Sequence, residues 1–147
     1  MQSFLDKISD LKCGWNERPL DENAFNRLAK KLKIHVRYMP LTVNGFYTCR
    51  KGRHYIVINQ KLSPRLAEFV MFHELGHYLM HSPSNDAIDN YCGSATHSRD
   101  EKEADAFAYC ALLPLGLFAM RSVEELADIY GSGFVMRRLE VYERYGI

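Results

Sequence analysis

The sequence has no long apolar run and almost no net charge. Its most apolar stretch, residues 109–120, is interrupted by Pro114 and Gly116, and it falls well short of the ~20 residues that a membrane-spanning helix needs. Nineteen Lys and Arg against 18 Asp and Glu leave a net charge of +1, so no global field attracts the chain to nucleic acid or to an anionic membrane. We therefore expect no membrane partner.

Cysteine-based signatures are also missing. The four cysteines, at positions 13, 49, 92 and 110, form no CxxC pair, which argues against a zinc knuckle or a dithiol redox motif. The first ten residues include Asp6 and contain no apolar stretch of the kind that a secretory signal requires. We expect a cytoplasmic protein with free thiols, because disulfides belong mainly to secreted chains.

What is present is typical of one compact domain. The 147 residues are 47% hydrophobic and 12% aromatic, which is enough for a single core, and no internal repeat is visible. We expect one domain over residues 1–147, made of an N-terminal extension (1–19), a central catalytic core (20–115) that carries the motifs described below, and a C-terminal helical tail (116–147).

Hydrophobic periodicity predicts an α+β fold. Apolar side chains at helical spacing indicate a helix over residues 20–32 with Asp21 as its N-cap. Strands rich in β-branched and aromatic residues follow, the last two forming a hairpin about Gly52. We expect a small, mainly antiparallel three-stranded sheet from residues 34–39, 45–49 and 54–58.

Helices dominate the rest of the sequence. Ser63 and Pro64 predict the start of a long helix that runs toward His81, and residues 82–97 have the composition of a loop. Further helices are predicted from the capping-box sequences that begin at Ser98 and Ser122, and over residues 134–145.

The most informative residues are His73, Glu74 and His77, an HExxH motif inside the long predicted helix. Four residues of α-helix advance about 6 Å and turn by about 40°, so both imidazoles project from one face and can share an ion. Neutral imidazoles suit zinc, and a catalytic zinc has three protein ligands and an open position for water. We interpret Glu74 as the general base that takes a proton from this water.

The third ligand has to come from elsewhere in the chain. Glu101 and Asp105 are one helical turn apart, so Glu101 can reach the metal while Asp105 holds the far nitrogen of a histidine. Glu103 would then point about 200° away. His81 lies about 6 Å beyond His77 along the helix, which favours a place at the cleft border or the helix end.

We therefore predict Zn²⁺ on His73, His77 and Glu101. A capping-box carboxylate is the alternative role for Glu101, and Cys92 and His97 are further candidate ligands. The same ligand types occur with non-haem iron, but two imidazoles, one carboxylate and an open position fit zinc.

Three stretches of the chain carry a wider resemblance. The sequence reads HYIVIN over residues 54–59, HELGHYLMH over 73–81 and EKEADAFAYCALLPL over 101–115. In these motifs, over roughly residues 20–115, the chain resembles the ImmA/IrrE family of small metallopeptidases. Asp105 stands where many relatives have Asn.

The resemblance implies a zincin-like α+β fold with zinc on His73, His77 and an acidic residue of the second motif. It also implies Glu74 as the catalytic base of a cytoplasmic endopeptidase. The substrate that it implies is a regulatory protein, often a helix-turn-helix transcriptional repressor of a mobile element or a stress response.

The alternative hypothesis is a DNA- or protein-binding regulatory module with a structural or degenerate metal site. Ala127, Gly131 and Leu139 are spaced as in a helix-turn-helix. A basic strip is also available from Arg27, Lys30, Lys31, Lys33 and Arg37. The neutral net charge and the acidic Glu124 and Glu125 disfavour direct nucleic-acid binding.

The strand over residues 54–58 suggests a route for substrate binding, because it directly precedes the metal helix. At a sheet edge it would pair with an extended peptide through the main chain. An ordinary edge, blunted by Arg53 and Lys61, fits the sequence equally well.

Overall fold

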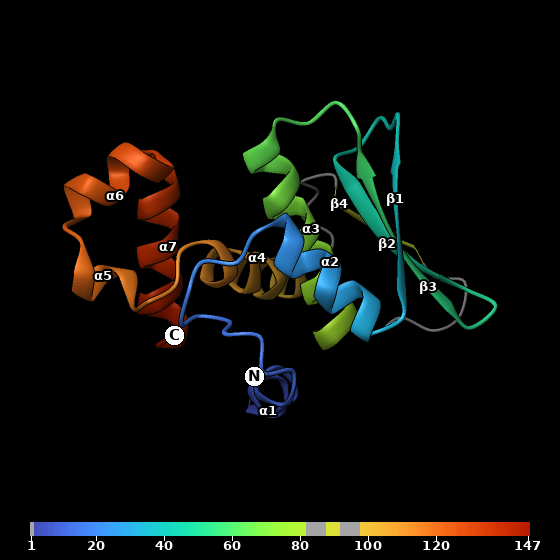
Figure 1. Ribbon diagram of the computed structural model, residues 1–147, viewed down its shortest axis with the longest axis horizontal. Helices are drawn as coiled ribbons and strands as arrows, with labels where there is room; N and C mark the ends of the chain where they lie inside the picture. Colours follow the sequence, from blue (N-terminus) through green and yellow to red (C-terminus); the bar gives the residue numbers. More distant parts are fainter. Residues whose placement is uncertain (1, 82–87, 92–97) are drawn as a thin grey trace.

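The computed structural model describes residues 2–81, 88–91 and 98–147, with the backbone alone for residues 2–4, 88–91 and 98. The fold is α+β, as predicted: the sheet lies at one end, the helices over residues 64–80 and 98–112 cross the centre, and the C-terminal helices form a layer at the other end (Figure 1). The elements are α1 (Gln2–Asp10), α2 (Glu22–Lys31), β1 (Ile34–Met39), β2 (Gly45–Arg50), β3 (Arg53–Asn59), α3 (Pro64–Met80), β4 (Ile88–Tyr91), α4 (Ser98–Leu112), α5 (Leu117–Met120), α6 (Val123–Tyr130) and α7 (Ser132–Tyr145).

The sheet has four strands in the order β1-β3-β2-β4. β3 pairs parallel with β1 and antiparallel with β2, and β2 pairs antiparallel with β4, so the mainly antiparallel arrangement is confirmed. The prediction of three strands is wrong by one, because β4 lies inside residues 82–97, the predicted loop. Asp89 and Asn90 have low strand propensity, and it is the pairing with β2 that makes this segment a strand.

The strand that precedes α3, β3, is in the interior of the sheet. The hypothesis that residues 54–58 form a free edge is therefore wrong, because both sides of β3 are paired. The parallel pairing of β1 places it outside β3. In the described part of the chain, β1 and β4 are the two edges.

α3 begins with the predicted cap and is buried along its centre. Ser63 Oγ accepts a hydrogen bond from the Leu66 N–H at 3.4 Å, and Pro64 occupies the first turn. Residues 69–77 are all buried, because the sheet packs on one side of the helix and α4 on another. The motif histidines are therefore part of the molecular interior.

Gly76 brings α3 and α4 close together. A Cβ atom at this position would lie 3.1 Å from Cδ1 of Phe107 and 3.3 Å from the Cα of Ala104. The missing side chain lets the α4 backbone approach the helix that carries the histidines. The face of α4 that bears the acidic motif is thereby held against the HExxH motif.

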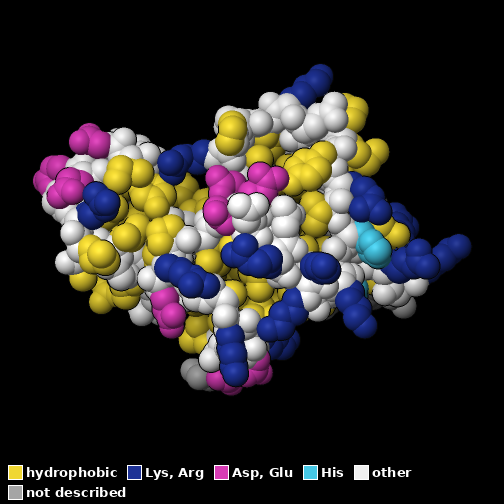
Figure 2. Space-filling view, viewed as in Figure 1, with side chains coloured by type: hydrophobic (Ala, Val, Ile, Leu, Met, Phe, Trp, Pro, Cys, Tyr) yellow, Lys and Arg dark blue, Asp and Glu magenta, His cyan; other side chains and the backbone are white. Residues whose placement is uncertain are grey.

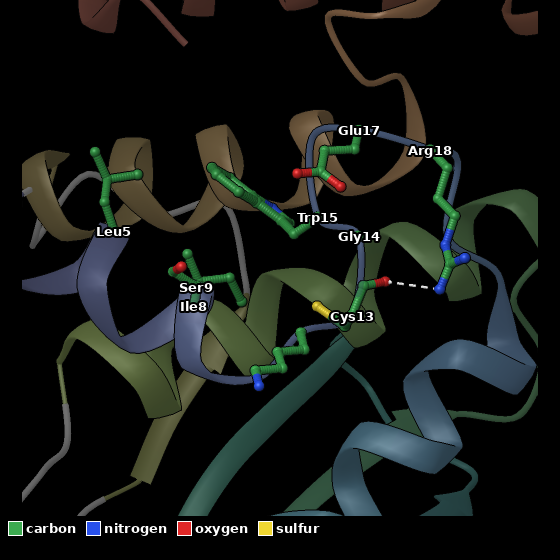
Figure 3. Close-up of a pocket in the computed structure, with 9 residues that line it drawn as sticks. Leu5, Ile8, Ser9, Cys13, Gly14, Trp15, Glu17 and Arg18 are labelled. Atoms are coloured by element: carbon green, nitrogen blue, oxygen red, sulfur yellow. Dashed lines mark hydrogen bonds between the residues drawn. The ribbon is translucent and has the colours of Figure 1, made fainter.

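The N-terminal residues pack on this central pair of helices. Ile8 of α1 is buried in the main core, and the Trp15 indole stacks on Phe107 and donates a hydrogen bond to its carbonyl at 3.0 Å. A cavity of about 630 Å³ lies between α1 and the segment that follows it (Figure 3). Its lining includes Leu5, Cys13 and Arg18 but none of the predicted site residues.

The C-terminal helices pack on the far side of α4. α6 starts with the predicted capping box of Ser122 and Glu125, and α7 buries Val135, Arg138 and Val141. The pair with helix-turn-helix spacing thus packs on the core through α7. Among the residues that the structure describes, no helix is both long and apolar enough to cross a membrane.

Candidate metal centre

The structure brings His73, His77 and Glu101 together between α3 and α4. The two Nε2 atoms of the histidines lie 3.1 Å apart. Glu101 places Oε2 3.2 Å from Nε2 of His73 and Oε1 2.9 Å from Nε2 of His77. Potential ligand atoms of three residues, from two helices, therefore converge on one point.

These separations fit a single bound ion. Ligand atoms about 2.1 Å from a zinc ion stand about 3.4 Å apart at the tetrahedral angle. Two imidazole nitrogens and one carboxylate are also a donor set that zinc prefers in hydrolases. The side chains of His73 and His77 are buried, whereas 20% of the Glu101 side chain is exposed, so Glu101 is the most accessible of the three residues.

His73 is held on its far side by Asp105. The Nδ1–H of His73 donates to Oδ1 of Asp105 at 2.7 Å, so that in the neutral ring the lone pair is on Nε2, the atom that faces His77 and Glu101. Burial lowers the pKa of His73, but the hydrogen bonds to Asp105 and Glu101 and the charge of Glu74 raise this pKa more. The predicted contact between Asp105 and the far nitrogen of His73 is therefore present.

The Glu101 carboxylate stays ionised from neutral pH down to strongly acidic pH. Burial raises its pKa, but the hydrogen bonds and charges of His73 and His77 lower the pKa further, to about 2. Metal ligands have to be deprotonated, and this environment keeps the carboxylate so. Both of its oxygens face imidazoles, which favours the ligand role over the capping role at the helix start.

Glu74 is completely buried on α3, directly after His73. Its negative charge contributes to the raised pKa of His73, so the carboxylate lies within electrostatic range of the centre. A carboxylate at this position, shielded from bulk water, is suited to accept a proton during catalysis.

Among the described residues, the other candidates do not join the three converging residues. Glu103 accepts a hydrogen bond from Arg99 Nε at 3.0 Å, in keeping with the rotation expected between it and Glu101. His81 is the C-cap residue of α3, one of the two places expected for it. Cys92 and His97 lie outside the described residues.

A second cluster beside the centre was missed by sequence reasoning. Ligand-type atoms of His81, Asp100 and Glu103 lie within 4.8 Å of one another. The four-residue step from His77 to His81 could have indicated that His81 lies near the centre. No sequence pattern indicates Asp100, because its position depends on how α4 meets the end of α3.

Comparison with known proteins gives two matches. The family model described as Peptidase_M78, IrrE N-terminal-like domain, matches residues 29–144, which include both α3 and α4. The "Uncharacterized immunity region protein 2" of Bacillus phage phi105 is 33% identical over 105 residues. That alignment covers 62% of this chain and 66% of the phage protein, just under two thirds of its length. The predicted resemblance is thus confirmed, and the chain belongs to the Peptidase_M78 (ImmA/IrrE) family with its IrrE N-terminal-like domain.

Proposed function

We propose that the chain is a zinc-dependent endopeptidase that hydrolyses a peptide bond in a regulatory protein. The observation that carries the proposal is the convergence of the ligand atoms of His73, His77 and Glu101 at separations of 2.9–3.2 Å. In the proposal these three residues hold the zinc, Glu74 is the general base and Asp105 supports His73. Membership of a peptidase family supports this chemistry.

A zinc ion held here would polarise the substrate carbonyl and lower the pKa of a water molecule to about 7. Glu74 takes a proton from the attacking water and delivers it to the leaving nitrogen as the peptide bond breaks. Asp105 keeps the hydrogen of His73 on Nδ1, so that the Nε2 lone pair stays available. Burial of both histidines and Glu74 limits the access of bulk water.

We propose that the substrate is a helix-turn-helix transcriptional repressor of a mobile element or a stress response, met in the cytoplasm. The phage phi105 relative is named for an immunity region. Cleavage is irreversible, so a peptidase of this kind would suit a switch in which a repressor has to be removed. The relative's name and the family membership support this choice of substrate class.

The decisive experiment compares the wild type with Glu74→Gln. Both proteins are loaded with zinc and incubated with candidate repressors, and the products are identified by mass spectrometry. The variant keeps all three ligands, so we expect one zinc per chain but a rate lower by roughly 10²–10⁴-fold, because the general base is gone. Glu68→Gln is the matched control: it makes the same change on α3, near Asp21 and Glu22, and should cleave normally.

Undiminished cleavage by Glu74→Gln would falsify the assignment of the base. Regulation in cells that survives the loss of this carboxylate would instead favour a binding module with a structural metal site.

A further inference from the structure

The two motif histidines have different partners on their Nδ1 atoms. Nδ1 of His73 meets a carboxylate, Asp105, at 2.7 Å, whereas Nδ1 of His77 lies 3.1 Å from Nδ1 of another imidazole, His81. The backbone N–H of His81 also donates to the His77 carbonyl at 2.8 Å. The main chain of this second pair is therefore held by the last turn of α3, which places the two rings side by side.

The direction of the hydrogen bond between these rings follows from the metal site. One of two facing Nδ1 atoms has to donate and the other has to accept. If Nε2 of His77 binds the ion, its lone pair is there and its hydrogen is on Nδ1. His77 is therefore the donor, and His81 accepts on Nδ1 and carries its own hydrogen on Nε2.

The far end of His81 faces two carboxylates of α4. Its Nε2 lies 3.5 Å from Oδ1 of Asp100 and 3.9 Å from Oε2 of Glu103. The side chains of His81 and Glu103 are 14% and 13% exposed, so the interaction is largely shielded, although 45% of Asp100 is exposed. An N–H at Nε2 is attracted by this negative charge, which favours the tautomer that accepts from His77.

We propose that His81 is a positioning residue for the metal centre. It accepts the Nδ1–H of His77 and points its own Nε2–H at Asp100 and Glu103, and it thereby fixes the tautomer and the ring orientation of His77. The carboxylate of Asp105 contacts His73 directly. The carboxylates of Asp100 and Glu103 act on His77 only through the imidazole of His81. This inference rests on the proposed zinc site and extends it to three more residues of the chain.

The cluster of His81, Asp100 and Glu103 also has the composition of a small cation site. Binding of a second ion to Nε2 of His81 conflicts with the first site, because that nitrogen would lose its hydrogen while Nδ1 accepts from His77. The ring would then be an imidazolate, an unfavourable form. Arg99 already pairs with Glu103, so the cluster has a cation of its own.

The test measures zinc affinity by competition with a chromophoric chelator, and zinc stoichiometry, in the full chain. His81→Phe keeps a ring but removes both nitrogens, and we expect a roughly 10–100-fold loss of affinity, as for other residues that orient metal ligands. His81→Asn offers an acceptor oxygen near the position of Nδ1, and most of the affinity should return. His35→Phe, the same change on an exposed residue of β1, is the control and should bind as the wild type does.

Nitrogen NMR of the zinc-loaded wild type gives an independent measurement that needs no folded variant. We expect the hydrogen of His77 on Nδ1 and that of His81 on Nε2, and the reverse assignment for His81 would overturn the proposal. Wild-type affinity in His81→Phe, or no recovery in His81→Asn, would overturn the positioning role and leave the zinc site standing. If the wild type bound two zinc ions per chain and His81→Phe lost one of them, His81 would be a ligand of a second cation site and the positioning role would be overturned. A wild type that takes up no zinc would overturn both this inference and the proposed function.

Discussion

Two regions of the molecule bury polar or charged side chains, in opposite ways. The central helices bury His73, Glu74 and His77, and the C-terminal layer buries Arg138. Arg138 donates to the carbonyls of Leu113 at 2.6 Å and Ile147 at 2.9 Å, and to Asn16 Oδ1 at 3.0 Å. Each of these contacts joins a donor to an acceptor.

On the inner side of the proposed metal centre, such complementarity needs protonated imidazoles, which donate to Glu101. There, two Nε2 atoms and a carboxylate face one another, all of them groups that offer lone pairs once the ligands are deprotonated. Such an arrangement is completed by a cation, whereas the Arg138 network is complete by itself. Buried polar groups that all offer lone pairs therefore indicate a functional site. Buried polar groups that pair donor with acceptor indicate a structural role.

The surfaces of the two regions differ as well. Figure 2 shows apolar side chains gathered over the C-terminal helices, at the left of the view. Exposed apolar residues of α5, α6 and α7 include Met120, Val123, Ile129 and Met136. Exposed apolar groups contribute little to stability, so the attachment of this layer depends on its inner face, where Arg138 lies.

The largest effect is expected at Glu101, because the metal centre depends on a cation. Glu101→Ala removes one of the three proposed ligands, and the purified protein should lose its stoichiometric zinc, as measured by elemental analysis. Glu103→Ala is the matched control and should keep one zinc per chain, with affinity lowered at most several-fold through His81. The opposite pattern would make Glu103 the ligand.

At Arg138 we expect a large effect on the free energy of unfolding and none on zinc affinity. Arg138→Met keeps much of the side-chain volume but removes three hydrogen bonds, which should lower the free energy of unfolding by about 3 kcal/mol. Urea denaturation of the metal-free protein measures this loss. The folded variant should bind zinc with wild-type affinity, and a tenfold weaker affinity would contradict the separation of the two regions.

An intermediate effect is expected at Asp105, which belongs to the metal centre without being a ligand. Asp105→Ala removes the acceptor of the His73 Nδ1–H and should weaken zinc binding roughly 10–100-fold. Asp105→Asn keeps an acceptor oxygen, so a change of only a few-fold is expected in the same chelator competition. Equal losses in both variants would show that the charge matters more than the hydrogen bond.

These predictions also show which parts of the molecule can be inferred from the sequence. The spacing of His73 and His77, and of Glu101 and Asp105, is a property of single helices, so the sequence predicts which side chains share a face. The caps at Asp21, Ser63 and Ser122 are local as well, and the structure confirms all three.

Contacts that depend on tertiary packing were not predictable in this way. β4 becomes a strand through pairing with β2, and Asp100 meets His81 because Gly76 lets α4 approach α3 closely. Arg138 looks like an ordinary surface residue of an amphipathic helix, and its burial depends on Leu113, Asn16 and Ile147, which lie far from it or outside its helix.

The smallest effect is expected at Ser122, where a purely local interaction can be removed from the C-terminal layer. Ser122 Oγ accepts from the Glu125 N–H at 3.2 Å, and the Glu125 carboxylate accepts from the Ser122 N–H at 3.4 Å. Ser122→Ala should lower the free energy of unfolding by about 1 kcal/mol in urea denaturation, because the Glu125 N–H at the start of α6 loses its acceptor. Ser132→Ala, at the start of α7, where the N-cap residue Gly131 makes no side-chain cap, should change it by less than about 0.5 kcal/mol. Zinc affinity should stay the same in both variants, and a coupled loss at Ser122 would mean that the C-terminal layer positions the metal ligands after all.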